Sequence, residues 1–447
     1  MPSQTSVKLR LLITSNALSG GGAETVAYAH GRIFARRTDF ETAVLVCEQR
    51  PDLDLTGITQ YVLPDFRRGS KMRGVLDRNF NKKAMAAVLA DFKPALVHLH
   101  AYLNFGAGAM RALSEYKRKS GCRVIITHHG YAQVCPNDYF FNFRANQICE
   151  KCLKNNKNDK NGGLGLLAGN CADNFAVSAG KYLQKRGLRK IFNDGDGLAD
   201  AHVTPCEFLR GKLLRKIPES DVRVIHNPCI ESVLAQTPEK TAGKMVYFGR
   251  VSREKNVAAA AKAVQQLSFP SASSSQSHAV RLTIIGSGPD EHAVNKALSG
   301  QNNENSRIDF INEFMPKSKL EQAISDAEYF ILPSVWYEVA PVSMLEAINL
   351  GMTPIVSHHG GMKEIVEKAG VGYMFDPTDI PSIAAALEEA VANRPKDAEK
   401  LAGDSVRGFL KSYTEQTYEE KIISLYSKIN SQKHLTTRQK DGIIYSL

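Results

Sequence analysis

Short apolar runs of four to six residues recur along the whole chain and alternate with stretches of helical spacing. In the first half these runs are Leu11–Thr14, Ala43–Cys47, Ala95–Leu99, Arg123–Thr127, Ala201–Thr204 and Val222–Ile225. In the second half they are Met245–Phe248, Leu282–Ile285, Ile308–Ile311, Tyr329–Leu332, Pro354–Ser357 and Gly372–Phe375. Strands of this kind, separated by helices, are typical of parallel sheets covered on both faces. The pattern therefore predicts an α/β fold.

The length of 447 residues allows two or three domains, each with its own core. The Asn227-Pro228 pair and the polar stretch after it predict a linker near 228–244. We therefore expect an N-terminal domain over 1–230 and a C-terminal domain over 231–404, with a Ser-rich surface loop over 268–277. Helical apolar spacing predicts a further helix over 405–430, followed by a polar tail over 431–447.

Composition and charge narrow the class of protein. With 43% hydrophobic and 23% charged residues the chain is globular, and no apolar run is long enough to span a membrane. The apolar run Leu9–Thr14 is too short for a signal peptide, so we expect a cytoplasmic protein. Residues 1–230 contain 34 Lys and Arg against 20 Asp and Glu, a balance of +14, whereas the remainder carries −3.

A basic half indicates an anionic partner, either a membrane surface, a lipid diphosphate or nucleic acid, although a merely solvated basic face is an equal alternative. No nucleic-acid-binding motif accompanies the charge, which makes nucleic acid the weakest of these. The expected location is the cytoplasm, with possible peripheral contact at the inner face of the plasma membrane.

The cysteines suggest a metal rather than disulfides. In a cytoplasmic chain eight cysteines argue against a disulfide framework. The Cys149-x2-Cys152 pair has the spacing that lets two thiolates bind one zinc ion, and Cys135 and Cys171 could complete a tetrahedron around the loop 151–162. Reduced bystander thiols and a redox pair remain alternatives. No open histidine set is evident, so a metal here would be structural.

The most informative segment is Trp336–Ala347, which carries Glu338 and Glu346. Pro341 fits a first helical position and Gly351 fits the residue just past the helix end, so Glu338 precedes the helix and Glu346 lies on its second turn. In parallel sheets, phosphate-bearing ligands bind where a strand end meets a helix N-terminus. The two carboxylates can accept hydrogen bonds from sugar and ribose hydroxyls, which indicates a nucleotide-sugar site. Two solvated surface charges are the alternative.

Two further strand ends of the second half carry phosphate-binding chemistry. Gly249-Arg250 and Lys255 follow one strand, and an Arg and a Lys together can hold a diphosphate. Gly286-Ser287-Gly288-Pro289 follows the next, where glycines permit close backbone approach. Each signal is weak alone, and a solvated basic loop is the alternative for the first.

In the first half, Gly20-Gly21-Gly22 opens an amphipathic helix, and backbone amides at such a helix start can face an anion or a sugar. A turn without a ligand is the alternative. His100 and His128-His129 stand at predicted strand ends, where histidines can contact substrate hydroxyls. We single out His129, because a lone histidine is more often structural.

Taken in order, these motifs resemble the retaining glycosyltransferases of family 4, also called glycosyl transferases group 1. The resemblance rests on the glycine loop, on His129 six residues before Cys135-Pro136, on Gly249-Arg250 with Lys255, on Gly286–Pro289 and on Glu338-x7-Glu346, and it extends from about residue 9 to about residue 428. It implies the GT-B fold, in which two Rossmann-like domains, one acceptor-binding and one nucleotide-sugar-binding, face each other across a cleft. The terminal helix then crosses back to the first domain.

The family resemblance also implies an activity and roles for residues. The activity is transfer of a sugar from a nucleotide diphosphate sugar to a glycan or lipid-linked acceptor in cell-surface polysaccharide or lipopolysaccharide biosynthesis, with retention and without a required cofactor or divalent metal. Arg250 and Lys255 would neutralise the leaving diphosphate, Glu346 would hold the ribose, and Glu338 would hold the donor sugar beside His129. The remaining positions are Gly22, Gly249, Gly286, Gly288, Ala340 and Pro341 on the donor side, and Gly21 and His100 on the acceptor side.

The chain departs from the family pattern at one point, because many members have Glu-Gly-Phe-Gly where this chain has Glu338-Val339-Ala340-Pro341. The triplets Asp52/Asp54 and Asp194/Asp196 follow no clear strand end, which argues against a metal-dependent transferase. The alternative functions are a non-catalytic nucleotide-sugar-binding partner subunit and a nucleotide-sugar epimerase or phosphorylase on the same fold.

Overall fold

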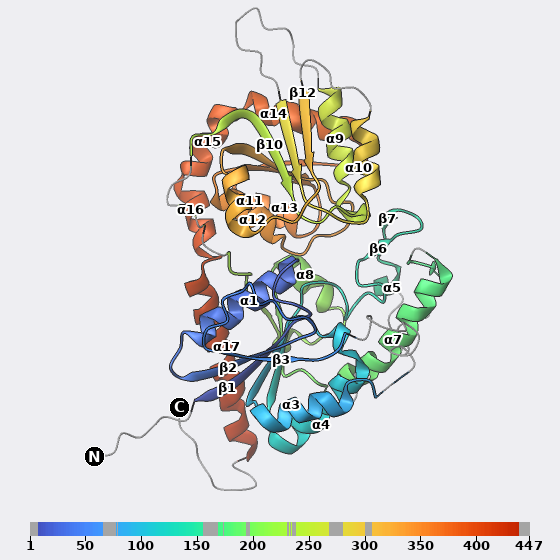
Figure 1. The fold of residues 1–447 in the computed structure, drawn as a ribbon, viewed down its shortest axis with the longest axis vertical. Helices are drawn as coiled ribbons and strands as arrows, with labels where there is room; N and C mark the ends of the chain where they lie inside the picture. The colour runs from blue at the N-terminus through green and yellow to red at the C-terminus, as the bar shows by residue number, and fades with distance from the viewer. Residues whose placement is uncertain are drawn as a thin grey trace, which may run out of the picture. The chain divides into compact units, whose positions relative to one another are not determined.

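The chain forms two compact units. The computed structural model describes residues 8–65, 77, 79–154, 169–172, 174–193, 197–229, 232, 234, 238–267, 280–299 and 306–437 (Figure 1). Unit 1 comprises residues 1–228 together with 415–447, and unit 2 comprises residues 229–414. The serine-rich segment 268–277, the triplet Asp194/Asp196 and most of the loop 151–162 lie outside the described residues.

Unit 1 is built on a parallel sheet of seven strands in the order β3-β2-β1-β4-β5-β8-β9. The strands are β1 Leu9–Thr14, β2 Phe40–Val46, β3 Ile58–Val62, β4 Leu96–Leu99, β5 Arg123–Thr127, β8 Ala201–Thr204 and β9 Val222–Val224. A separate antiparallel hairpin joins β6 (Phe141–Asn142) to β7 (Gln147–Ile148). The strand order reverses between β1 and β4, which leaves their two carboxyl ends side by side.

Helices cover both faces of this sheet, as the near-continuous apolar strands require. Successive residues of β1 point to opposite faces: Leu12 joins a core with α3 and α4, whereas Leu11 and Ile13 join a core with α1 and α17. The described helices of unit 1 are α1 Gly22–Ala35, α3 Lys82–Phe92, η1 Leu103–Phe105, α4 Gly106–Ser120, α5 Lys151–Lys154, α7 Phe175–Asn193, α8 Glu207–Leu213, η2 Glu219–Asp221 and α17 Glu415–Thr437.

The last helix, α17, belongs to the fold of unit 1 although it follows unit 2 in sequence (Figure 1). Tyr418, Ile422 and Tyr426 of α17 are at most 2% exposed and pack in the same core as Leu11 and Ile13 of β1. At its N-terminal end Glu419 pairs with Arg37 at 2.7 Å. Burial of this apolar face binds α17 to the N-terminal sheet.

Unit 2 contains a six-stranded parallel sheet in the order β12-β11-β10-β13-β14-β15. The strands are β10 Thr241–Phe248, β11 Val280–Ile285, β12 Ser306–Ile311, β13 Ala327–Leu332, β14 Thr353–Ser357 and β15 Tyr373–Phe375. Its described helices are η3 Arg253–Lys255, α9 Val257–Gln266, α10 Glu291–Leu298, α11 Lys317–Ile324, α12 Val342–Asn349, α13 Gly360–Ala369, α14 Ile380–Ala392, α15 Arg394–Ala402 and α16 Asp404–Lys411. The strand order reverses between β10 and β13.

The structure contains a strand at each of the twelve apolar runs and adds three more. The edge strand β3 was not predicted because its pattern is mostly polar and half-exposed, and the hairpin strands β6 and β7 are only two residues long. The single helix expected over 405–430 is wrong: α16 ends at Lys411 within unit 2, and α17 starts at Glu415. None of the described helices has a stretch long and apolar enough to cross a membrane.

Candidate functional site

The first set of site residues lies at the strand-order reversal of unit 2. β10 pairs with β11 on one side and with β13 on the other, all parallel, so the loops after these strands leave the same edge of the sheet. Open parallel sheets bind ligands outside the carboxyl ends of their strands at such a reversal. The loops that meet there are 249–256, 286–290 and 333–341. Arg250, Lys255 and Glu338 therefore come from adjoining loops of one sheet edge.

Lys255 and Glu338 form a buried ion pair at this edge. The Lys255 Nζ atom lies 2.6 Å from Glu338 Oε1, and the carboxylate is 5% exposed. Ser334 Oγ and Trp336 Nε1 donate to the same oxygen, each at 2.7 Å. All three hydrogen bonds fall on Oε1, so no described residue donates to Oε2.

The ionisation of Glu338 follows from these contacts. Burial by itself raises the pKa of the Glu338 carboxyl, but the charge and hydrogen bond of Lys255 and the hydrogen bonds of Ser334 and Trp336 outweigh it. The net pKa lies below the usual value for a glutamate. Glu338 is therefore a carboxylate at neutral pH, with one oxygen free to accept a hydrogen bond.

Arg250 brings a second positive charge to the same loop. Its guanidinium pairs with Glu254, and its side chain stays about half exposed, at 52%. Tyr247 Oη donates to the Arg250 carbonyl at 2.6 Å, and the Val335 amide donates to the Glu254 carbonyl at 2.9 Å. The basic loop is thus fixed to the loop that carries Glu338.

Glycines allow these three loops and the start of α13 to approach one another closely. An added Cβ at Gly286 would lie 1.8 Å from the Gly249 carbonyl oxygen, and one at Gly288 would lie 2.2 Å from that of Val251. An added Cβ at Gly361 would lie 1.6 Å from the Val339 carbonyl oxygen. The Gly361 amide donates to the Glu338 carbonyl at 2.7 Å. No side chain fits at Gly286, Gly288 or Gly361, so these positions shape the site through backbone contact. Gly249 has space for a Cβ, but its φ of 142° is one that other residues rarely adopt.

Glu346 lies on the second turn of α12, as the sequence predicts. It is half-buried, and no described residue donates a hydrogen bond to its carboxylate. Burial raises the pKa of Glu346 to about 7, with a smaller lowering by Lys317. A buried carboxyl group without a donor is available for ligand hydroxyls.

The start of α12 differs by one residue from the sequence prediction. Pro341 is the N-cap, with φ −66° and ψ 115°, and the helix begins at Val342. Pro341 and Ala340 are both buried in the loop that follows Glu338. Gly351 has φ 75°, which fits the left-handed position just past the helix end.

The second set of site residues lies at the strand-order reversal of unit 1. Gly21 is the N-cap of α1, Gly22 is its first residue, and both are exposed. His129 follows β5 and is half-buried. Burial lowers the pKa of His129 to about 4, so the ring is neutral near pH 7. The Nδ1 atom of His129 has no hydrogen-bond partner among the described residues.

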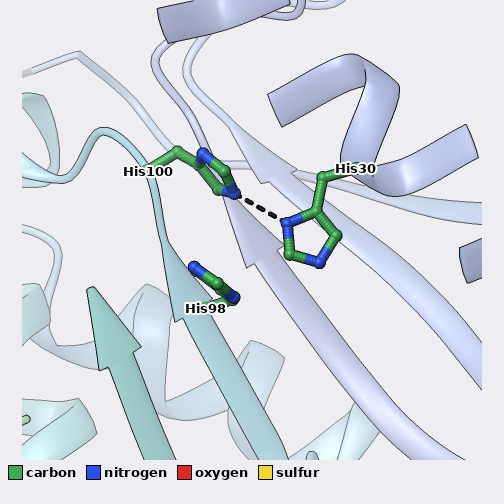
Figure 2. A group of neighbouring side chains, drawn as sticks. All are labelled: His30, His98 and His100. Atoms are coloured by element: carbon green, nitrogen blue, oxygen red, sulfur yellow. Dashed lines mark hydrogen bonds between the residues drawn. The ribbon is translucent and has the colours of Figure 1, made fainter. Parts of the chain in front are cut away.

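His129 stands at the end of a buried chain of hydrogen-bonded rings. His129 Nε2 lies 2.9 Å from His100 Nδ1. His100 Nε2 lies 2.8 Å from His30 Nδ1, the contact drawn as a dashed line in Figure 2. Both ring nitrogens of His100 already have partners and the residue is 4% exposed. Neither ring nitrogen of His100 is therefore available for the acceptor-side contact predicted from the sequence. Instead, His100 forms a hydrogen bond with His129.

The four clustered cysteines lie in a different part of unit 1. Cys135, Cys149, Cys152 and Cys171 line one small cavity, and none of them forms a disulfide. Burial, together with the nearby Cys149, Cys152 and Cys135, raises the pKa of the Cys171 thiol to about 12. The structure thus brings together all four cysteines that the sequence singled out.

The described triplet Asp52/Asp54 does not form a metal site. Arg50 donates to Asp52 at 2.8 Å, Arg32 pairs with Asp54, and both aspartates are exposed. Each carboxylate is neutralised by an arginine.

Several residues that complete these sites have no sequence signature. Ser334 and Trp336 bond Glu338, and the ring of His359 lies within hydrogen-bond distance of the Ser334 and Trp336 carbonyls, at 3.1 and 3.0 Å. His30 joins His100 from the middle of α1. Trp336 is the single tryptophan of the chain and adjoins a predicted site, which is the one signal that could have drawn attention to it.

Comparison with known proteins gives two family matches. The family described as Glycosyltransferase Family 4 matches residues 20–230, and the one described as Glycosyl transferases group 1 matches residues 233–405. The alpha-maltose-1-phosphate synthase of Mycolicibacterium smegmatis is 26% identical over 258 residues, 52% of this chain. The putative colanic acid biosynthesis glycosyltransferase WcaL of Salmonella typhimurium is 27% identical over 154 residues, 33% of this chain. The chain spans 64% and 35% of the lengths of these two relatives.

Solved structures share the fold at low sequence identity. Anabaena HepE, in complex with UDP and glucose, matches with a TM-score of 0.63 and 13% identity, over 94% of this chain and 100% of that one. WaaG, a glycosyltransferase involved in lipopolysaccharide biosynthesis, matches with a TM-score of 0.59 and 12% identity, over 93% and 99% of the two chains. At these identities the likeness establishes the fold.

Proposed function

The chain belongs to glycosyltransferase family 4 and has the GT-B fold of two Rossmann-like parallel-sheet domains, and on this basis we propose that it transfers a sugar from a nucleotide diphosphate sugar to a glycan or lipid-linked acceptor, with retention of anomeric configuration. Unit 2 would bind the donor and unit 1 the acceptor. The observation that carries the proposal is the buried Lys255–Glu338 pair at the strand-order reversal of unit 2, with Arg250 on the same loop.

In the proposed reaction, Arg250 and Lys255 hold the donor diphosphate. Negative charge grows on the leaving phosphate as its bond to the sugar breaks, and fixed positive charges in a partly buried site stabilise that charge. Lys255 has a side-chain exposure of 18%, so its charge is poorly screened. In this proposal the two side chains stabilise the leaving diphosphate, a role that a divalent metal ion has in other transferases.

Glu338 then holds the donor sugar as a hydrogen-bond acceptor. Its Oε2 atom has no donor among the described residues, whereas Oε1 receives three. A carboxylate so strongly neutralised is a poor nucleophile, which favours a retaining step in which the leaving phosphate activates the acceptor hydroxyl. His129 contacts a donor hydroxyl, and Glu346 accepts hydrogen bonds from the ribose.

Similarity to proteins of colanic acid and lipopolysaccharide biosynthesis supports a cell-surface polysaccharide as the product. The balance of +14 in residues 1–230 supports an anionic lipid-linked acceptor and peripheral contact with the inner face of the membrane from a cytoplasmic protein. The structures of HepE with UDP and with UDP-glucose make UDP-sugars the first donors to test.

The test is incubation of the purified full chain with a panel of UDP- and GDP-sugars, followed by proton NMR. We expect slow hydrolysis of one donor that releases the sugar with its original anomeric configuration. A non-catalytic binding subunit would protect a donor without consuming it, an epimerase would convert the donor into its isomer, and either result would overturn the proposal.

A further inference from the structure

The four-cysteine cavity is small. It is lined by Cys135, Cys149, Cys152 and Cys171 together with Pro136, Asn137 and Phe141, and its volume is about 10 Å³. One water needs about that much room. A water there would meet four weakly polar thiols, which are poor hydrogen-bond partners. A metal ion suits this lining better.

The backbone brings these cysteines together from four short segments. Cys135 lies in the turn after β5, and its carbonyl accepts from the Asp138 amide at 3.1 Å. Cys149 follows the β6–β7 hairpin, with its amide bonded to the Phe140 carbonyl at 2.8 Å, and Cys152 lies on α5. The Cys171 carbonyl accepts from the Phe143 amide at 3.0 Å.

Asn137 ties two of these segments from inside. Its side-chain amide donates to the Phe141 carbonyl at 3.0 Å and to the Cys171 carbonyl at 3.1 Å, and Lys181 Nζ donates to its oxygen at 2.7 Å. The residue is 2% exposed. The segments around the cavity are therefore held in register by a satisfied buried amide.

This region carries backbone strain and little regular structure. Asp138, Phe140, Asn146 and Asn170 all have positive φ, between 41° and 75°. Non-glycine residues adopt such angles at a cost of about 1–3 kcal/mol each and keep them only where the surroundings over-determine the backbone. Among the described residues between Cys135 and Cys171, the regular elements are two strands of two residues and one helix of four. A cross-link among the four cysteines would stabilise these short segments.

We propose that Cys135, Cys149, Cys152 and Cys171 bind one structural zinc ion. Zinc is tetrahedral and prefers thiolates, and two cysteines spaced Cys-x2-Cys are its most frequent paired ligands. Four protein ligands leave no open position, so the ion stabilises the segments 131–154 and 169–172 and takes no part in sugar transfer. Binding releases the thiol protons and contributes to folding free energy.

A second group of metal-binding side chains exists in unit 1 but does not need a metal. The ligand atoms of His30, His98 and His100 lie within 4.8 Å of one another (Figure 2). Every ring nitrogen of this trio already has a hydrogen-bond partner: His98 bonds Thr127 and Tyr426, each at 2.7 Å, and His30 bonds His100 and Tyr426, at 2.8 and 3.1 Å. A metal would have to displace these bonds.

Elemental analysis of the purified full chain tests the zinc proposal. We expect one zinc per chain in the wild type and in Cys47→Ser, a control at a cysteine outside the cavity. Cys149→Ser/Cys152→Ser should lose the zinc. Zinc-free wild type, or one zinc per chain retained in the double variant, would overturn the proposal.

Cobalt substitution of the wild type keeps the test independent of how well the double variant folds. Thiolate ligands give Co²⁺ an intense near-ultraviolet charge-transfer band, which histidine ligands do not. Cobalt bound without this band would assign the metal to the histidines and contradict the cysteine site.

The histidine chain carries a second, independent inference. Burial lowers the pKa of His30, His98 and His100 far below the usual value, so each of these rings is neutral and carries one N–H. The contacts form a continuous chain from His129 through His100, His30, Tyr426 and His98 to Thr127. Along the three directly bonded rings His129, His100 and His30, placing one proton therefore places the others.

Tyr418 of α17 places that proton. Its hydroxyl lies 3.0 Å from His30 Nδ1, it is 2% exposed, and it has no other hydrogen-bond partner among the described residues. A buried hydroxyl that fails to donate costs about 1–3 kcal/mol. Tyr418 therefore donates to His30 Nδ1, which must be unprotonated.

From this point the geometry assigns the tautomer of His129. With His30 Nδ1 unprotonated, His100 Nε2 must carry a proton, because two bare ring nitrogens would repel each other at 2.8 Å. The one lone pair of His30 Nδ1 is then shared between the Tyr418 and His100 donors, and His100 Nδ1 is an acceptor. His129 Nε2 donates to it, so His129 Nδ1 carries a lone pair. We infer that Tyr418 is a positioning residue that keeps His129 Nδ1 a hydrogen-bond acceptor, ready for a sugar hydroxyl under the proposed function.

The test is ¹⁵N NMR of histidine-labelled full chain, with His129→Asn to assign the signal. We expect His129 Nδ1 unprotonated in the wild type and in the control Tyr28→Phe, whose half-buried hydroxyl donates to the Asp54 carbonyl and lies outside the histidine chain. Tyr418→Phe should show a mixture of tautomers. The donor KM should rise three- to ten-fold in Tyr418→Phe with little change in kcat. A protonated Nδ1 in the wild type, or an unchanged tautomer in Tyr418→Phe, would overturn the inference. The spectra are informative whether or not the protein transfers sugar.

Discussion

The ammonium group of Lys255 lies 2.6 Å from Glu338 Oε1, across two loops that are 83 residues apart in sequence. Ser334 and Trp336 donate to the same oxygen, so the pair is a fixed group rather than a flexible surface contact. Both residues lie at the strand-order reversal of unit 2, where a parallel sheet binds its ligand.

Trp336→Phe removes one of the three donors to Glu338. Because these donors keep the Glu338 pKa low, loss of the Trp336 donor should raise that pKa. The acid limb of the pH profile, where Glu338 takes up a proton and activity is lost, should therefore move to higher pH. A hydrogen bond to a charged group is worth about 1.5 kcal/mol, or roughly one pH unit. The pH profile of kcat/KM measures the shift. An acid limb that stays in place would show that Glu338 does not act as a carboxylate.

Glu346→Gln separates the charge of this side chain from its shape. Glu346 titrates at about 7 in the folded protein, so donor affinity that depends on the carboxylate should rise with pH through about 7 in the wild type and stay flat in the variant. Titration calorimetry between pH 6 and pH 8 measures the difference. Parallel curves for the two proteins would remove Glu346 from ribose binding.

Glu346 should affect the stability of the folded protein in the opposite direction: donor affinity rises with pH, whereas stability falls. A carboxyl group whose pKa is raised on folding holds its proton in the folded state between its unfolded value of about 4.5 and about 7, so stability falls as the pH rises through that window. Glu346→Gln should therefore raise the thermal midpoint at pH 8 relative to wild type, and this gain should vanish below about pH 4.5. A lower midpoint at pH 8 would mean that the carboxylate makes a stabilising contact.

Much of the fold follows from the sequence, because apolar strand runs and helical periodicity depend on local order. The donor-side motifs were found for the same reason: Gly249–Arg250, Gly286–Pro289 and the two glutamates stand at strand ends. The missing parts depend on long-range contacts. Nothing local marks Ser334 as a donor to Glu338, or places His30 of α1 against His100, because loop conformation and packing decide both.

Gly286→Ala should damage the donor site without unfolding unit 2. The new Cβ would lie 1.8 Å from the Gly249 carbonyl oxygen, and Gly286 has φ 144°, so the basic loop must shift. We expect donor affinity to fall at least ten-fold. Gly408→Ala in α16 is the matched control: no atom lies within 4 Å of its added Cβ, and the change should stabilise the helix by about 0.5–1 kcal/mol. Equal donor affinity in the two variants would contradict the close loop packing.

Ile422→Ala tests the docking of α17 on the N-terminal sheet. Ile422 is fully buried in the core shared with Leu11 and Ile13, and truncation of such a side chain costs about 2–5 kcal/mol. Hydrogen exchange should show increased opening of β1 and α17. Protection unchanged from the wild type would mean that α17 contributes little to unit 1.

The cations of loop 249–256 are proposed to bind the donor diphosphate, and calorimetric titration of the full chain with UDP and GDP measures this binding. Two charge-assisted contacts are together worth at least about 3 kcal/mol, so Arg250→Ala/Lys255→Ala should weaken binding of the preferred nucleotide at least about 100-fold. Lys262→Ala, at an exposed position of the adjoining helix α9, should bind like the wild type. Nucleotide binding of equal strength in the double variant and the wild type would contradict the account.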